Sequence, residues 1–126
     1  MKFPLTNQEI FDAAYKGVMA QGNRCVNEKG KCVYLGPNNQ RCAASHVFAI
    51  SDPNVSLKRF KSSESSGIVM RHFGYLDEKA DAFIRSLQDI HDSAGKNEKS
   101  IPFIDHYHQD MVDFAHMKGL TIPEVV

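Results

Sequence analysis

The chain of 126 residues has no tryptophan, only three cysteines and no excess charge of either sign. Lysine and arginine together number 15, and so do aspartate and glutamate, so the formal net charge is zero. A neutral chain has no overall field that attracts nucleic acid or an anionic membrane. The absence of tryptophan excludes little, but the neutral charge argues against DNA, RNA and lipid surfaces as partners.

Long apolar runs are also missing. No stretch approaches the roughly 20 apolar residues that a membrane helix needs, and residues 1–5 lack the apolar core of a secretory signal. Three cysteines is an odd number, which fits a reducing compartment better than a complete set of disulfides. We therefore expect a cytoplasmic protein that has no membrane partner and whose thiols are reduced or bound to metal.

Length and composition predict a single domain over residues 1–126. Apolar residues make up 42% and charged residues 24% of the chain, as in ordinary globular proteins. A chain of this length buries a hydrophobic core without the help of disulfides. No internal repeat or low-complexity segment divides it.

Three segments have the periodicity and the end signals of amphipathic helices. Thr6 and Glu9 form a capping-box pattern at the start of the first, and Gly22 is suited to end it. Gly95 and Gly119 are the expected stops of the other two. The predicted helices cover residues 7–21, 78–93 and 103–118, with a shorter one at 67–73.

Short strands are expected between the first two long helices. Residues 24–26 and 31–35 have strand composition and are separated by turn residues. Residues 40–50 follow a second turn and are compatible with a third strand or a helix. These features predict an α+β fold, in which three amphipathic helices pack on a small antiparallel hairpin or three-stranded meander. Because two strands alone are only marginally stable, the hairpin should pack on the helix at 78–93.

The hairpin region resembles a segment of a known group of proteins. The run CVYLGP at residues 32–37, followed by RCAA at 41–44, is similar to a C-x-Y-x-G-P…C-A segment in short proteins of bacteriophages and their bacterial hosts. There it follows a helix that ends in Gln-Gly, as residues 21–22 do here, and a later L-Q-x-I-H-D element matches residues 87–92.

This group has no assigned activity, so the resemblance carries over no catalytic role. It implies a phage-type accessory protein in the cytoplasm of a bacterial host, where such proteins bind and inhibit or redirect a host protein, for example one of a defence system.

A metal site is one alternative for the cysteines. The candidate ligands are Cys25, Cys32, Cys42 and His46, and zinc prefers four tetrahedral nitrogen or sulfur ligands. Structural zinc sites use ligand pairs two to four residues apart, and only Cys42 and His46 have that spacing. The similar proteins often carry a small residue at the position of His46 and do not share Cys25. We therefore predict no metal and no cofactor, with buried apolar cysteines as the simpler interpretation.

A small thiol enzyme is a second alternative. His91 continues the apolar stripe of its helix, so its ring should point inward, where Cys42 or Cys32 close to it would become an activated thiolate. Asp92 follows directly and lies about 100° further around the helix, so we expect that it does not orient the imidazole. Because nucleophile, base and orienting group are not all in place, no catalytic residue is assigned.

Binding to a protein is the favoured function. The turn at residues 36–39 projects side chains at low entropic cost, and tyrosine and arginine carry much of the energy of protein interfaces. The basic cluster at residues 58–61 would steer the chain toward an acidic surface on the host partner. The predicted contact residues are Tyr34, Asn38, Asn39, Arg41, Lys58, Arg59 and Lys61.

A third hypothesis is a protein that sequesters a small ligand or nucleotide. It predicts a pocket lined by Tyr34, Arg41 and the amides of a helix N-terminus. Binding to a protein predicts instead an exposed apolar or charged patch, and the enzyme predicts a sulfur within about 4 Å of a ring nitrogen. The sequence leaves the partner and the oligomeric state open.

Overall fold

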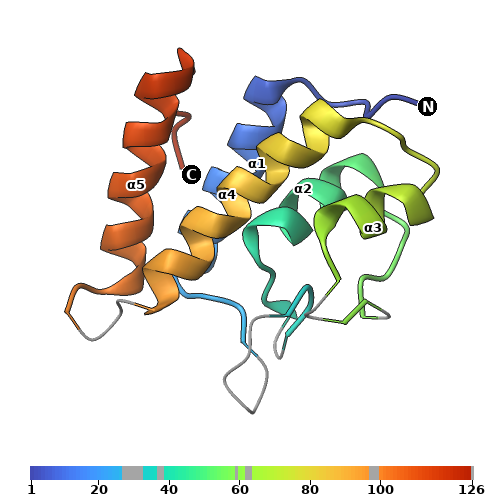
Figure 1. Ribbon diagram of the computed structural model, residues 1–126. Helices are drawn as coiled ribbons and strands as arrows, with labels where there is room; N and C mark the ends of the chain where they lie inside the picture. The colour runs from blue at the N-terminus through green and yellow to red at the C-terminus, as the bar shows by residue number, and fades with distance from the viewer. Residues whose placement is uncertain (27–32, 37–38, 59, 62–63, 97–99, 126) are drawn as a thin grey trace.

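The computed structural model describes residues 1–26, 33–36, 39–58, 60–61, 64–96 and 100–125. These residues contain five helices, which are α1 (Asn7–Gln21), α2 (Ala43–Ser51), α3 (Ser66–His72), α4 (Glu78–Lys96) and α5 (Phe103–Lys118). The longest, α4, runs diagonally across the molecule, with α5 on one side, α2 and α3 on the other and α1 behind it (Figure 1). All four of these helices pack against α4.

The predicted α+β class is wrong, because the described residues form an all-α fold without a sheet. Leu35 and Arg41 pair as an isolated antiparallel bridge, and the Val33 amide donates to the Cys25 carbonyl oxygen at 3.4 Å. The ambiguous segment after them is helix α2, which removes the third strand. Two short strands are too few for an independent sheet. Residues 31 and 32 of the predicted second strand lie outside the described residues.

The first and last predicted helices are confirmed. Thr6 Oγ1 accepts from the Glu9 amide at 3.2 Å, while the Thr6 amide donates to Glu9 Oε1 at 2.9 Å, which completes the capping box before α1. Gly22 and Gly119 end α1 and α5 with φ angles of 84° and 70°, in the left-handed region that glycine adopts without strain.

Helix α4 continues to Lys96, so the expected stop at Gly95 is wrong. Gly95 is buried inside the helix, and a Cβ there would lie 3.1 Å from Arg24 Cδ. The Arg24 side chain lies across this position, and its NH1 donates to the Gly95 carbonyl oxygen at 3.4 Å. Close approach of a neighbouring side chain, rather than a helix end, explains the glycine.

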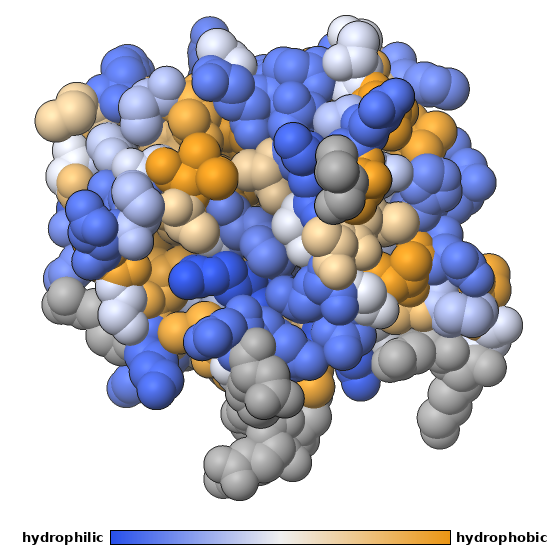
Figure 2. Space-filling model, turned by 180° about the vertical axis from the view of Figure 1, so that it is seen from behind, coloured by the Kyte–Doolittle hydropathy of each residue, from blue (hydrophilic) through white to orange (hydrophobic). Residues whose placement is uncertain are grey.

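The core is built on the inward face of α4. The buried positions follow helical spacing: Ala80, Phe83, Ile84, Leu87, His91 and Ala94. Phe83 packs edge-on against Phe114 of α5, with ring centroids 5.4 Å apart. On the face opposite to that of Figure 1, apolar residues form separate patches divided by hydrophilic ones (Figure 2).

Hydrogen bonds join α5 and the segment just after it to α1, although the two helices are far apart in the sequence. The Tyr107 hydroxyl donates to the Ala14 carbonyl oxygen at 3.1 Å, and burial raises the pKa of this phenol well above its usual value, so it stays a neutral donor. Thr121, just beyond α5, exchanges two hydrogen bonds of 3.0 Å with Gln8.

The contact between α1 and α2 depends on Gly17. The ring of His46 lies against this glycine, and a Cβ at residue 17 would come within 2.3 Å of His46 Cγ. His46 Nε2 also lies 3.2 Å from Gln21 Oε1. The imidazole of His46 therefore occupies the space that a side chain at residue 17 would fill.

The first prediction concerns Gly17→Ala. In a helix interior this change ordinarily stabilises by about 0.5–1 kcal/mol, but here overpacking against His46 should destabilise the protein by about 1–3 kcal/mol in urea unfolding. In a His46→Ala background the same change should be neutral or stabilising. A stabilising Gly17→Ala in the otherwise unchanged protein would show that the ring does not need this space.

The second prediction concerns pH. Burial, together with the charges of Arg41 and His91, lowers the pKa of His46 to about 4, whereas an unfolded histidine titrates near pH 6.5. Because the unfolded state binds the proton first, stability should fall as the pH drops from about 6.5 to about 4, by at most about 3 kcal/mol. Partial exposure of the ring reduces this figure.

Urea unfolding between pH 7 and 4 measures the effect. His46→Gln should flatten the pH dependence, because it removes the group that binds the proton more readily in the unfolded state. Equal slopes for His46→Gln and the unchanged protein would contradict the prediction.

Candidate functional site

A pocket of about 370 Å³ lies between residues 33–34, the N-terminus of α2, the segment before α3 and one face of α4. Its walls include Tyr34, Cys42, Glu64, Gln88, Asp89 and Asp92. The volume is at the lower end of the range for small-molecule sites. This pocket brings together residues that are up to 59 positions apart in the chain, Val33 and Asp92.

The inner wall is a hydrogen-bonded chain that begins at the α2 backbone. Gln88 Oε1 accepts from the Ala44 amide at 3.0 Å, and Gln88 Nε2 donates to Asp92 Oδ1 at 2.9 Å. The same carboxylate oxygen lies 3.1 Å from His91 Nδ1. Gln88 thus satisfies one of the amides that a helix N-terminus leaves without a partner inside the helix.

The expectation that Asp92 does not orient His91 is wrong. The angle between neighbouring residues describes where their Cβ atoms point, but the outer atoms of the two side chains bend toward each other and meet at 3.1 Å. The His91 ring is fully buried and packs edge-on against Phe103 and Tyr107.

Cys42 occupies the N-cap position of α2, lines the pocket and is 3% exposed. His91 Nε2 is buried and makes no hydrogen bond within the described part of the chain. His91 Nε2 therefore makes no hydrogen bond to the Cys42 thiol of the kind that the enzyme hypothesis needs. Cys32, the other predicted nucleophile, lies outside the described residues.

Tyr34 is buried rather than exposed. Its hydroxyl donates to the Glu64 carbonyl oxygen at 2.6 Å, and its ring lies 6.2 Å from that of Phe60. Burial is the main reason that the pKa of this phenol is raised, with smaller contributions from the charges of Cys42 and Glu64. Tyr34 is therefore a neutral donor that joins the wall of the pocket to the segment before α3.

The positive charge of Arg85 is already paired. Its guanidinium meets both carboxylate oxygens of Asp81 at 3.1 Å, and NH2 also donates to Ser65 Oγ at 3.4 Å. The Ser66 hydroxyl donates to Asp81 as well, at 2.5 Å. A bidentate pair of this kind holds the guanidinium in place and offsets its charge.

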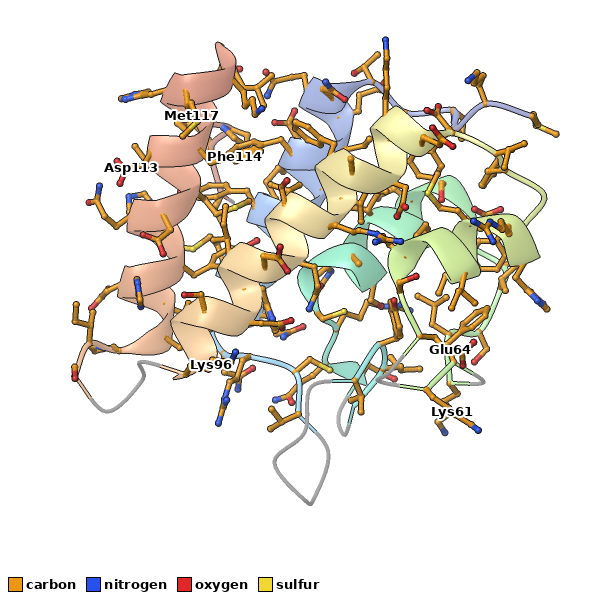
Figure 3. The ribbon with its side chains drawn as sticks, viewed as in Figure 1. Lys61, Glu64, Lys96, Asp113, Phe114 and Met117 are labelled. Atoms are coloured by element: carbon orange, nitrogen blue, oxygen red, sulfur yellow. The ribbon has the colours of Figure 1, made fainter. Side chains whose placement is uncertain are left out.

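Three carboxylates line the pocket, at Glu64, Asp89 and Asp92. Glu64 Oε1 accepts from the Lys61 amide at 2.7 Å, and the two residues lie together below α3 (Figure 3). Asp89 is exposed and has no hydrogen bond or ion pair with the described residues. With three carboxylates and one guanidinium, the described residues of the lining carry two more negative than positive charges.

The other predicted contact residues that the structure describes do not line this pocket. Arg41 and Asn39 line a different groove of about 550 Å³ between α1 and α2, which also contains His46. Lys58 and Lys61 are exposed. Asn38 and Arg59 lie outside the described residues.

The candidate metal ligands that the structure describes lie in different places and have different partners. The Cys25 thiol is buried and donates to the Gln40 carbonyl oxygen at 3.1 Å, and burial raises its pKa. Cys42 faces the pocket, while His46 lies in the α1–α2 groove beside Gln21. In the described ranges no group of three or more histidine, cysteine or acidic side chains is arranged to hold a metal ion.

Several residues of the pocket were not predicted, chiefly Gln88, Asp89, Arg85 and Glu64. Gln88 and Asp89 belong to the element at residues 87–92 that supports the resemblance, which is the one signal in the sequence that points to them. Glu64 and Arg85 reach the pocket only through tertiary packing.

No family model matches the chain, and neither a curated protein nor a solved structure matches it.

Among the described residues, no helix has the length and apolar character to cross a membrane.

The third prediction concerns Gln88→Ala. This change leaves the Ala44 amide without its acceptor in a buried place, which should cost about 1–3 kcal/mol in unfolding free energy. Gln109→Ala is the matched control, because Gln109 is exposed and its amide donates to Asp113, one turn further along the same exposed helix face. Equal stability of the two variants, measured by urea unfolding, would contradict the role given to Gln88.

Proposed function

We propose that the protein binds a small organic cation in this pocket, an amine or guanidine that carries an apolar group. The observation that carries the proposal is the balance of hydrogen-bonding groups in the lining. Four described side-chain donors of the lining are bonded within the protein, and carboxylate oxygens of Glu64 and Asp89 are available to a ligand.

Four of the described side-chain donors in the lining have partners within the protein. Tyr34 donates to the Glu64 carbonyl, Ser66 and Arg85 donate to Asp81, and Gln88 donates to Asp92. Glu64 and Asp89 keep carboxylate oxygens available at the edge of the pocket. A ligand rich in N–H donors complements such a lining, because ionised acceptors form the stronger hydrogen bonds.

The remaining wall is apolar. Val33, the Tyr34 ring, the Cys42 side chain and Ala44 also line the pocket. This division favours a ligand with a charged head and an apolar body, since small-molecule sites combine apolar walls with a few orienting polar groups.

The nucleotide alternative has less support at this pocket. The Ala44 amide, which would bind a phosphate at the N-terminus of α2, is taken by Gln88. Arg41, expected beside the phosphate, lines the α1–α2 groove instead. The excess negative charge of the lining also opposes an anion.

The role implied by the resemblance uses another surface. Binding of an acidic host protein through the basic residues Lys58 and Lys61 stays a prediction, as does the thiol enzyme based on Cys42 or Cys32 with His91.

The fourth prediction tests the charge preference by calorimetric titration of tyramine, with 4-hydroxyphenylacetate as the matched anion. Tyramine should bind and the anion should not. Glu64→Gln and Asp89→Asn should each weaken tyramine binding about tenfold, which is the loss of about 1.4 kcal/mol expected for one charged contact. Glu124→Gln, an exposed position outside the pocket, is the control.

Equal binding of the anion, or unchanged affinity in both pocket variants, would overturn the proposal. A circular-dichroism melt of each variant shows whether a loss of binding comes from a loss of fold.

A further inference from the structure

Helices α4 and α5 diverge from the connection between them (Figure 1), and a groove of about 340 Å³ lies in the angle that they form. Ile90 contributes to it from α4, and Phe114 and Met117 contribute from α5. Phe114 extends from α5 toward α4, and Met117 follows one turn later (Figure 3). These three side chains form an apolar floor.

Met117 is 77% exposed, which is unusual for a large apolar side chain beside a groove. Methionine is flexible and polarisable, and it adapts its shape to an apolar side chain that packs on it. Phe114 packs edge-on against Phe83 of α4. Lys118 Nζ lies 5.7 Å from the centroid of the Phe114 ring. A cation of this chain thus already uses the face of that ring.

The rim of the groove is acidic. It carries Asp89, Asp110 and Asp113, and no lysine or arginine is among the described residues that line it. Asp110 lies 3.1 Å from His106 Nε2, and Asp113 accepts from Gln109 at 3.1 Å, so both carboxylates are positioned from within α5. Three carboxylates around an apolar floor form a local negative field on a chain whose net charge is zero.

We propose that this α4–α5 groove docks a basic amphipathic segment of another protein. An apolar side chain of the segment packs on Phe114 and Met117, and lysine or arginine residues on either side of it meet the aspartates of the rim. The choice of partner rests on charge complementarity, because an acidic rim around an apolar floor matches a cationic segment with an apolar stripe and repels an acidic one.

The α4–α5 groove is a second site beside the small-cation pocket, and apart from Asp89 the described residues that line the two differ. Of the residues that the structure describes, Asp89 alone lines both places, because it lies on the ridge of α4 between them. Variants at Asp110, Asp113 and Met117 therefore test the groove, and Glu64→Gln tests the pocket.

The probe is a fluorescein-labelled helical peptide of leucine and lysine, about 18 residues or five turns long, with a leucine–glutamate peptide of the same pattern as control. Fluorescence anisotropy should show binding of the lysine peptide, weaker at about 0.15 M than at about 0.01 M salt because screening shortens the reach of the charges. The glutamate peptide should not bind.

Matched variants locate the site. The double change Asp110→Asn and Asp113→Asn should weaken the lysine peptide at least about tenfold, and Met117→Gln should weaken it at both salt concentrations. Asp105→Asn on the same helix and Leu76→Gln, another exposed apolar position elsewhere, should bind as the unchanged protein does. Glu64→Gln should also keep full peptide binding.

Three outcomes would overturn the proposal. The first is equal binding of the glutamate peptide, and the second is full affinity in the Asp110 and Asp113 double variant. The third is self-association of the protein in sedimentation that Met117→Gln abolishes, which would assign the groove to a second copy of the chain. Melting curves of the variants separate a lost contact from a lost fold.

Discussion

Burial of one face of α4 is the constraint on which the other helices depend. Each of them packs on this helix, and its inward positions at Phe83, Ile84 and Leu87 meet their side chains. Because that face is covered, other positions of α4 are available to line the small-cation pocket and the α4–α5 groove. Gln88 and Asp92 face the pocket, Ile90 and Ser93 face the groove, and Asp89 lies between them. Both sites are therefore held by a rigid element rather than by loops alone.

The helices could be predicted because their signals are local. The capping box at Thr6 and Glu9 and the left-handed glycines at 22 and 119 act on the residues next to them, so they need no knowledge of the fold. Gly95 shows the limit of this reasoning. Its sequence context is that of a helix stop, but the approach of Arg24 from a distant part of the chain explains its presence inside α4.

The fold class and the pocket were beyond reach because they depend on tertiary packing. Tyr34 has the side chain of a strand residue, yet it is buried beside the segment before α3, where its hydroxyl finds the Glu64 carbonyl. Packing likewise overrides β propensity when too few residues are available for a sheet. Gln88 acquires its role only when the α2 amide of Ala44 comes within hydrogen-bonding distance. Spacing in the sequence does not reveal such a contact.

The bonds that join α1 to α5 have a consequence for how the chain folds. Tyr107 and Ala14 are 93 positions apart, and Gln8 and Thr121 are 113 positions apart. Contacts of such high sequence separation slow folding, because the entropy of closing a long loop is lost before the contact forms. During synthesis α1 emerges long before α5. The side of α1 that packs on α5 therefore has no partner until the end of the chain is made. The early chain thus exposes apolar surface that only its final helix covers, which is the interval in which chaperones bind or neighbouring chains aggregate.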